Sequence, residues 1–361
     1  MELVGVLPFR ELARRGICQS VYVDEAKVSG GYLAWADVVL FVRPCSSRAQ
    51  AVAQVARAVG RRVLSHYDDD LLRLPPGTAS EAYYGSAGIR QRLLWFLQQS
   101  DQLCFSNPVL AEAYREFTDR PMTVLAVGIT CPDLVPRAED RRRILFAGSL
   151  DHGSFVNRIC AEALQAAVAA HGAEVELYCL GARPDLVGDL PVEYLPYIDD
   201  YDDYRELVAS LASDICLAPL QEGDFFARKF YNKLLDYGSL GAAIIFSDVP
   251  PYQGVVRDGE NGLLVPNDPA AWRKALLRLI GDRELRLGLG LAARRYVEEH
   301  HSVAWAADSY QSALAETLAY RAAPASDAAC AVPNRGLFRE NLADHGLGRT
   351  LRRGMKKFLG I

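Results

Sequence analysis

The sequence predicts an α/β protein made of two domains, each built on a parallel β-sheet. Short aliphatic and β-branched runs alternate with longer helical patterns along almost the whole chain, and this alternation is typical of parallel sheets covered by helices. The chain has 361 residues, more than a single hydrophobic core usually supports. A polar segment rich in proline and arginine, residues 131–143, separates a first set of strands and helices from a second.

Local patterns give the elements in order. The expected strands span residues 37–42, 62–67, 102–105, 123–127, 143–147, 174–179, 214–218, 243–246 and 262–265. Residues 46–59 form the clearest helix between them, and Asn107 and Asp268 are expected to cap helices that begin with proline. Ligands in open α/β sheets bind beyond the carboxyl ends of the strands. We therefore expect two Rossmann-like domains facing each other across a cleft, with candidate site residues just after the strands.

The start of the chain departs from this pattern. Residues 7–16 show a helical pattern with a glycine stop, and residues 1–6 are too few for the strand and glycine-rich turn that open a Rossmann-like unit. The first strand of the N-terminal domain is therefore expected to be missing or short. The expected boundaries are 1–137 for the first domain, 138–320 for the second, and 321–361 for a linker and basic tail.

Composition excludes several classes of protein. The net charge is −5, and residues 1–334 alone carry −10, so a nucleic-acid binder with a basic face is not expected. The eight cysteines are scattered without a Cys-x-x-Cys pair, which favours reduced thiols in a cytoplasmic protein. No apolar run has the length of a membrane span, and no basic region precedes the short apolar stretch at the N-terminus.

The end of the chain has the opposite charge. Residues 335–361 carry a net charge of +5, and within residues 346–361 an apolar stripe lies beside five cations. The stripe consists of Leu347, Leu351, Met355 and Phe358. This pattern indicates a helix on an anionic membrane surface, which would make the protein cytoplasmic and peripheral on the inner face of the membrane. A partner-docking helix and a frayed terminus remain open alternatives.

The most informative segment is 226–241, which predicts one helix directly before a strand. At about 100° per residue, two lysines and an aspartate share one side of this helix and an apolar stripe occupies another. The charged side comprises Lys229, Lys233 and Asp236, and the stripe comprises Phe230, Leu234 and Tyr237. Such a helix suits a nucleoside diphosphate at its N-terminus and a ribose further along.

Residues 226–262 resemble a known family. Arg228-Lys229, then Asn232 to Gly241 followed by a buried strand, then Asp258-Gly-Glu-Asn-Gly262 resemble the donor-binding core of retaining nucleotide-sugar glycosyltransferases of the GT-B fold, those like glycosyltransferase family 4 (glycosyl transferases group 1). Residues 63–70, 144–149 and 204–220 support the resemblance. It covers about residues 7–315 and is strongest in the second domain. It implies an acceptor domain followed by a donor domain.

The resemblance assigns roles in the donor domain. Asp236 matches the carboxylate that receives the ribose hydroxyls, and Lys229 and Lys233 would meet the diphosphate, where charge builds as it leaves. Gly148 and Ser149 end the first strand of this domain, where bare backbone N–H groups can approach a phosphate. A surface aspartate, a solvated lysine pair and a simple tight turn are the structural alternatives.

One position departs from the family pattern. The first acid of the family's Glu-x7-Glu pattern should lie eight residues before Asp236, where this chain has Arg228. Glu222 lies in a nearby loop from which it could contact the sugar. The departure puts the role of that first acid in doubt while it adds a cation for the phosphates.

In the first domain, the run His66-Tyr-Asp-Asp-Asp70 follows an apolar strand. The resemblance implies that His66, Asp68 and Asp69 lie at the reacting centre and orient the acceptor or the donor sugar. Asp68 and Asp70 also fit the metal-binding Asp-x-Asp of the other glycosyltransferase fold, but that fold has one sheet domain. A helix cap with two solvated acids is the structural alternative. His300-His301 lacks the spacing of a helical metal pair and is taken as structural.

Taken together, the resemblance implies a hexosyltransferase-type glycosyltransferase, as in polysaccharide biosynthesis. It would move a sugar from a UDP- or GDP-sugar to an acceptor hydroxyl on a glycan, lipid-linked saccharide or small molecule, with retention and without a metal. The donor substrate would be its only cofactor-like partner. The main alternative is a catalytically inactive glycosyltransferase-like subunit that binds a partner, and a nucleotide-sugar epimerase fits the donor helix less well.

Overall fold

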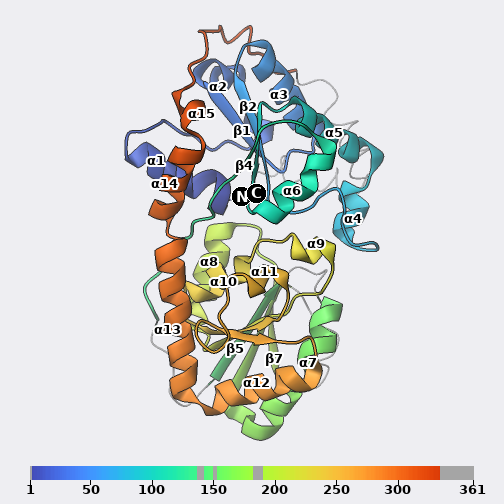
Figure 1. The fold of residues 1–361 in the computed structure, drawn as a ribbon, viewed down its shortest axis with the longest axis vertical. Coiled ribbons are helices and arrows are strands. Elements are labelled where there is room, and N and C mark those ends of the chain that lie inside the picture. The colour runs from blue at the N-terminus through green and yellow to red at the C-terminus, as the bar shows by residue number, and fades with distance from the viewer. Residues whose placement is uncertain (1, 136–141, 149–152, 182–189, 334–361) are drawn as a thin grey trace, which may run out of the picture. The chain divides into compact units, whose positions relative to one another are not determined.

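The computed structural model describes residues 2–135, 142–148, 153–181 and 190–333 (Figure 1). The chain forms two compact units. The first comprises Leu3–Ala126 together with residues 307–333, and the second comprises Val127–Ala306. The boundaries expected from sequence, at residues 137 and 320, lie beyond these two points.

The first unit contains a four-stranded parallel sheet with the order β1-β2-β3-β4. Its strands are β1 (Val38–Val42), β2 (Arg62–Tyr67), β3 (Gln102–Phe105) and β4 (Met122–Val124). Its helices are α1 (Leu7–Arg14), α2 (Gly30–Trp35), α3 (Ser47–Ala58), α4 (Ala79–Tyr84), α5 (Ala87–Gln99) and α6 (Pro108–Tyr114). The predicted strands are confirmed, although β4 ends earlier than expected. Asn107 caps α6 ahead of Pro108, as predicted.

Residues 2–6, ahead of α1, form a π-helix, η1 (Glu2–Val6). Within the described residues, β1 is the first strand of this unit. The idea that a family-typical first strand is missing or short remains a prediction.

The chain after residue 306 returns to the first unit. Tyr310 of α14 (Val303–Ala313) donates a hydrogen bond from its hydroxyl to the Val4 carbonyl (2.7 Å), and its ring packs edge-on against Phe9. These side chains and Leu12 pack in one cluster with Leu64 of β2. After α14 comes α15 (Ala315–Ala319). The C-terminal helices therefore complete the core of the first unit.

The second unit contains a six-stranded parallel sheet with the order β10-β9-β8-β5-β6-β7. Its strands are β5 (Arg142–Gly148), β6 (Val175–Gly181), β7 (Val192–Leu195), β8 (Ile215–Ala218), β9 (Ala243–Ser247) and β10 (Leu263–Val265). β7 was not predicted from the sequence. Its helices are α7 (Gly153–His171), α8 (Tyr201–Ser210), α9 (Asp224–Ala227), α10 (Asn232–Gly238), α11 (Pro250–Gln253), α12 (Pro269–Gly281) and α13 (Arg283–His300).

Helices cover this sheet on its two faces. α7 and α12 pack against each other over the largest core cluster, and α13 runs along the unit against α10 and β9 (Figure 1). Asp200 caps α8, and Asp268 caps α12 as expected from sequence. Every paired strand is parallel, which confirms the predicted parallel order.

The strand order of the second unit reverses once. From β5 the chain builds outward through β6 and β7, then returns to the other side of β5 with β8 and continues through β9 and β10. Such a switch point opens a crevice beyond the carboxyl ends of the two central strands. In this unit those ends are Gly148 and Ala218.

The prediction of one continuous helix over residues 226–241 is wrong. The structure has two short helices, α9 and α10, with non-helical residues 228–231 between them. Phe230 and Tyr231 stack on each other (ring centroids 4.1 Å apart) and pack against His301. This tertiary contact overrides the helical pattern. Lys229 therefore lies outside the helix that carries Lys233 and Asp236.

No helix within the described ranges is long and apolar enough to cross a bilayer. Cys104, Cys160 and Cys179 are buried members of the two cores, as the sequence suggested for its cysteines. The amphipathic pattern of residues 346–361 lies outside the described residues.

Candidate functional site

The switch point of the second unit is bordered by two glycines. Gly148 ends β5 and pairs with Gly181 at the end of β6. Gly181 has a φ of +81°, and a Cβ there would lie 2.4 Å from the Gly148 carbonyl oxygen. Only glycine fits this close backbone approach, which leaves bare main chain at the edge of the sheet. Ser149, predicted with Gly148, lies outside the described residues.

Asp236 is a buried carboxylate on α10, with 6% of its surface exposed. Its Oδ2 accepts a hydrogen bond from the Tyr204 hydroxyl (3.3 Å) and lies 3.5 Å from Lys233 Nζ. Arg205 Nη1 lies 4.0 Å from Oδ1. Among the described residues, Oδ1 has no hydrogen-bond partner. The carboxylate is therefore held through one oxygen and has hydrogen-bonding capacity left on the other.

The aromatic rings around this carboxylate fix the lysine beside it. Lys233 Nζ lies 5.2 Å from the centroid of the Tyr237 ring and 5.9 Å from that of Tyr204, within cation–π range. Burial, with the nearby charge of Asp236, raises the pKa of Tyr204, so its hydroxyl stays protonated and donates. The predicted shared side of Lys233 and Asp236 is confirmed.

The other predicted donor residues lie in the segment before α10. Arg228 Nη2 is 3.5 Å from Asp224 Oδ2, and Lys229 Nζ lies 4.6 Å from the centroid of the Phe225 ring. Glu222 is exposed in the loop after β8. Because β8 ends at the switch point, this segment begins at the same carboxyl edge of the sheet as Gly148.

In the first unit, Asp68 and Asp69 follow β2, and an arginine that follows β1 binds both. Arg43 contacts Asp68 through Nε and, at 2.7 Å, through Nη2, and Nη2 lies 3.2 Å from Asp69 Oδ2. The Arg43 N–H donates to the carbonyl of His66 (2.9 Å). The ends of the two strands are thus joined by both main chain and side chain.

These contacts decide the protonation of the predicted reacting centre. Burial favours a higher pKa for the Asp68 carboxyl, but the charge and hydrogen bonds of Arg43 outweigh it and hold this pKa well below its usual range. Burial lowers the pKa of His66 to about 4. His66 has no exposed surface, and neither ring nitrogen has a hydrogen-bond partner among the described residues. Asp68 is therefore an ion-paired anion and His66 a neutral ring at pH 7.

The two carboxylates of the Asp-x-Asp alternative face different cations. Asp70 Oδ2 lies 2.9 Å from Arg73 Nε, whereas Asp68 pairs with Arg43. In the part of the chain that the structure describes, no group of three or more acidic, histidine or cysteine side chains is arranged to hold a metal ion.

His301 has a structural environment, as expected. It is buried, its Nδ1 lies 2.9 Å from the Val127 carbonyl oxygen, and its Nε2 lies 3.3 Å from the Tyr231 hydroxyl. Burial lowers the pKa of His301. The ring fastens the segment before α10 to the start of the second unit.

Sequence reasoning missed Arg43, Tyr204 and Arg205. Arg43 directly follows the strand predicted at 37–42, so the rule that selected Asp68 could have found it. Tyr204 ends the acidic run 199–204, whose local signal is that of a helix cap. Arg205 lies within a helix and carries no local signal.

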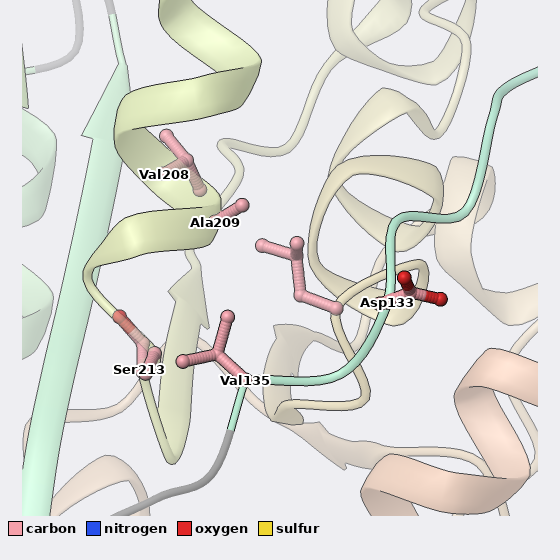
Figure 2. Close-up of a pocket in the computed structure, with 7 residues that line it drawn as sticks. Asp133, Val135, Val208, Ala209 and Ser213 are labelled. Atoms are coloured by element: carbon pink, nitrogen blue, oxygen red, sulfur yellow. The ribbon is translucent and has the colours of Figure 1, made fainter.

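A small pocket lies at the opposite edge of this sheet, near the amino end of β8 (Figure 2). Figure 2 shows Val208, Ala209 and Ser213 on one side, with Asp133 and Val135 on the chain segment that faces them. Its volume of about 10 Å³ is at the lower limit for one water molecule. It is too small for a nucleotide or a sugar.

Comparison with known families identifies the second unit. Residues 141–282 match the model of the family described as glycosyl transferases group 1. The second unit is a group 1 glycosyltransferase domain. The switch point, Gly148 and α10 all lie within the matched residues.

Two curated proteins are also similar to part of the chain. Phosphatidyl-myo-inositol mannosyltransferase of Mycolicibacterium smegmatis is 28% identical over 176 residues, which cover 47% of this chain and 43% of that protein. The enzyme of the same name from Mycobacterium leprae is 33% identical over 110 residues, 29% of this chain and 28% of that protein. The match spans less than half the length of either relative.

Solved structures align with most of the chain, beyond the group 1 domain. Sucrose-phosphate synthase from Thermosynechococcus elongatus aligns over 80% of this chain and 76% of its own, with a TM-score of 0.56 and 19% identity. Anabaena Alr3699/HepE in complex with UDP and glucose aligns over 83% and 84%, with a TM-score of 0.56 and 14% identity. The chain has the GT-B glycosyltransferase fold.

Proposed function

We propose that this protein is a hexosyltransferase that moves a sugar from a UDP- or GDP-sugar to an acceptor hydroxyl. One observation carries the proposal: a group 1 domain holds the buried carboxylate of Asp236 beside Lys233, on the helix that follows the switch point. A buried carboxylate with one unbonded oxygen suits the paired hydroxyls of a ribose. An ammonium next to it suits the phosphates.

Different residues of the second unit would bind different parts of the donor. Asp236 accepts hydrogen bonds from the ribose, while Lys233 and the main chain at Gly148 face the diphosphate. The bond between the anomeric carbon and the diphosphate oxygen breaks, the acceptor oxygen forms the new bond, and its proton leaves with the diphosphate. Arg228 and Lys229, from the segment after β8, add positive charge that stabilises the leaving group. We propose that transfer proceeds with retention and without a metal ion.

The first unit supplies polar groups that are poor bases. Asp68 is neutralised by Arg43, and His66 is neutral because it is buried. Asp68 and Asp69 are suited to orient sugar hydroxyls by hydrogen bonding, whereas the His66 ring has no exposed surface with which to contact a sugar. This agrees with a same-face attack in which the leaving diphosphate, rather than a protein side chain, takes the acceptor proton.

The names of the curated relatives suggest an acceptor class. Both are phosphatidyl-myo-inositol mannosyltransferases, so a lipid-linked acceptor at the cytoplasmic face of a membrane is our preferred choice. The basic, amphipathic pattern of residues 346–361 supports peripheral contact with such a surface.

An inactive subunit is the second candidate, because one observation favours it. Arg228 occupies the position of the family's first acid and pairs with Asp224. A protein of this kind would keep nucleotide binding or lose it, but it would not turn over any nucleotide sugar.

Thermal unfolding with a panel of nucleotides and nucleotide sugars tests the proposal. UDP or GDP at about 100 times its Kd stabilises the folded state by about 2.7 kcal/mol, which raises Tm by several degrees. Asp236→Asn should lower the affinity for that nucleotide tenfold or more, which corresponds to roughly 1.4 kcal/mol of binding free energy. Glu284→Gln, which changes an exposed carboxylate on α13, is the matched control and should bind normally.

The outcomes separate the candidates. Stabilisation followed by slow release of free sugar from a nucleotide sugar supports the transferase. Stabilisation without turnover of any nucleotide sugar supports the inactive subunit. If no nucleotide or nucleotide sugar raises Tm, the transferase is wrong, and an inactive subunit that has lost nucleotide binding is the candidate left.

A further inference from the structure

Arg205 lies in the middle of α8 and directs its guanidinium group at α10. Its side chain is largely buried, with 13% exposed. Nη1 donates to the main-chain oxygen of Asp236 (3.1 Å), and Nη2 donates to Ser239 Oγ (2.9 Å) and to the Thr130 carbonyl (3.2 Å). One planar group thus binds the helix and the segment that enters the second unit.

Ser239 completes this arrangement at the end of α10. Its hydroxyl donates to the same Asp236 carbonyl (2.9 Å) that accepts from Arg205. Carbonyls in the last turn of a helix lack intrahelical partners, so these two donors fix the main chain of Asp236. A main chain held at two points limits the directions that its side chain can take.

The guanidinium also acts on the Asp236 carboxylate at a distance. Nη1 lies 4.0 Å from Oδ1, close enough for electrostatic attraction and too far for a hydrogen bond. Lys233 lies near the other carboxylate oxygen, so the two cations together offset the cost of burying this charge. Oδ1 keeps its capacity to accept a hydrogen bond from a ligand.

A second arginine, Arg294, binds the same two segments as Arg205 but not Asp236. Its Nε pairs with Glu298 (2.7 Å). Arg294 Nη1 donates to the main-chain oxygen of Ser239 (3.0 Å) and to the Pro132 carbonyl (2.8 Å). Both arginines therefore bind Ser239 and one carbonyl of residues 130–132. Arg294 is the natural control for effects that come from fastening this segment alone.

We infer that Arg205 is a positioning residue for the nucleotide, acting through Asp236. The inference rests on the proposed function, because it assigns Arg205 to the site where that function places the ribose. Arg205 fixes the Asp236 main chain, places positive charge near its carboxylate, and joins both to Thr130. It does not itself contact the nucleotide.

Calorimetric titration of UDP and GDP tests this with Arg205→Lys, Arg294→Lys, Asp236→Asn and the Arg205→Lys/Asp236→Asn double variant. A single ammonium cannot span the Asp236 and Thr130 carbonyls as a guanidinium does. Arg205→Lys should weaken nucleotide binding roughly tenfold, and Arg294→Lys less than about twofold. Both should lower Tm to a similar extent, because each loses contacts to Ser239 and to residues 130–132.

The double variant shows whether Arg205 acts through Asp236. If it does, Arg205→Lys should cause little further loss of affinity once Asp236 is asparagine. Equal losses in the two lysine variants, or fully additive losses in the double variant, would overturn the inference. Ser239→Ala, which removes only the bridging hydroxyl, should also weaken binding and serves if Arg205→Lys does not fold.

Failure of the proposed function gives a different result. Wild-type protein that binds neither nucleotide would remove the proposed function, and the role of Arg205 would fall with it. Wild-type protein that binds normally while Arg205→Lys binds equally well would overturn only the role of Arg205.

Discussion

Arg43 holds a main-chain conformation that residues other than glycine rarely adopt. Its φ is +49°, which costs about 1–2 kcal/mol. The strain turns the chain at the end of β1 so that the guanidinium reaches Asp68 and Asp69 after β2. Strained residues of this kind gather at functional sites, which supports the choice of this edge for sugar contacts.

His66 makes the stability of the first unit depend on pH. Its pKa is about 4 in the folded protein against 6.5 in the unfolded chain. Above pH 6.5 both states hold a neutral ring, and between pH 6.5 and 4 only the unfolded state gains the proton. Stability should therefore fall as the pH drops through this window, by up to about 3 kcal/mol from His66.

Urea unfolding between pH 7.5 and 4.5 checks this prediction in the wild type and in His66→Asn. The charges near the ring, Asp68 and Arg43, are ionised throughout this range and cannot produce the same slope. The variant should lose the part of the pH dependence that comes from His66, while the part from His301, whose pKa is also lowered by burial, remains. An identical slope in both proteins would show that folding does not lower the pKa of His66.

At the scale of elements, the sequence predicted nine of the strands, and its errors have physical causes. The strand β7 includes Glu193 and lies at an edge of the sheet, so it lacks the continuous apolar run of a central strand. The break before α10 comes from the packing of Phe230 and Tyr231 on His301. A local pattern cannot show a partner seventy positions away.

Tyr237 anchors α10 to the central strand of the group 1 domain. Its ring is fully buried, and its hydroxyl accepts a hydrogen bond from the Ala147 N–H (2.9 Å), next to Gly148. Tyr237→Phe leaves that N–H without its partner and should cost about 1–3 kcal/mol of unfolding free energy. Because α10 carries Lys233 and Asp236, nucleotide affinity should fall as well.

Chemical denaturation and nucleotide titration of Tyr237→Phe measure both effects. Tyr197→Phe is the control, since Tyr197 is 61% exposed and its change should stay within about 0.5 kcal/mol. Equal stability of the two variants would mean that the hydroxyl does not fasten the helix to the strand.

At the scale of the whole molecule, the parallel order and the two-unit organisation could be read from the chain, but the boundaries could not. Thr130 directly precedes the predicted linker, residues 131–143, and Pro132 lies at its start. Arg205 and Arg294 nevertheless bind their carbonyls and hold them in the second unit. Such contacts join residues far apart in sequence. The same reason explains the site: residues just after strands were found, whereas Arg205, in the middle of a helix, was not.

The central claim is that the group 1 domain binds a nucleotide with its ribose at Asp236. A crystal structure of the protein with UDP or GDP tests it most directly. We predict ribose hydroxyls within hydrogen-bond distance of the Asp236 carboxylate, with the diphosphate beside Lys233 and the main chain at Gly148. A nucleotide bound with its ribose away from Asp236 would contradict the account.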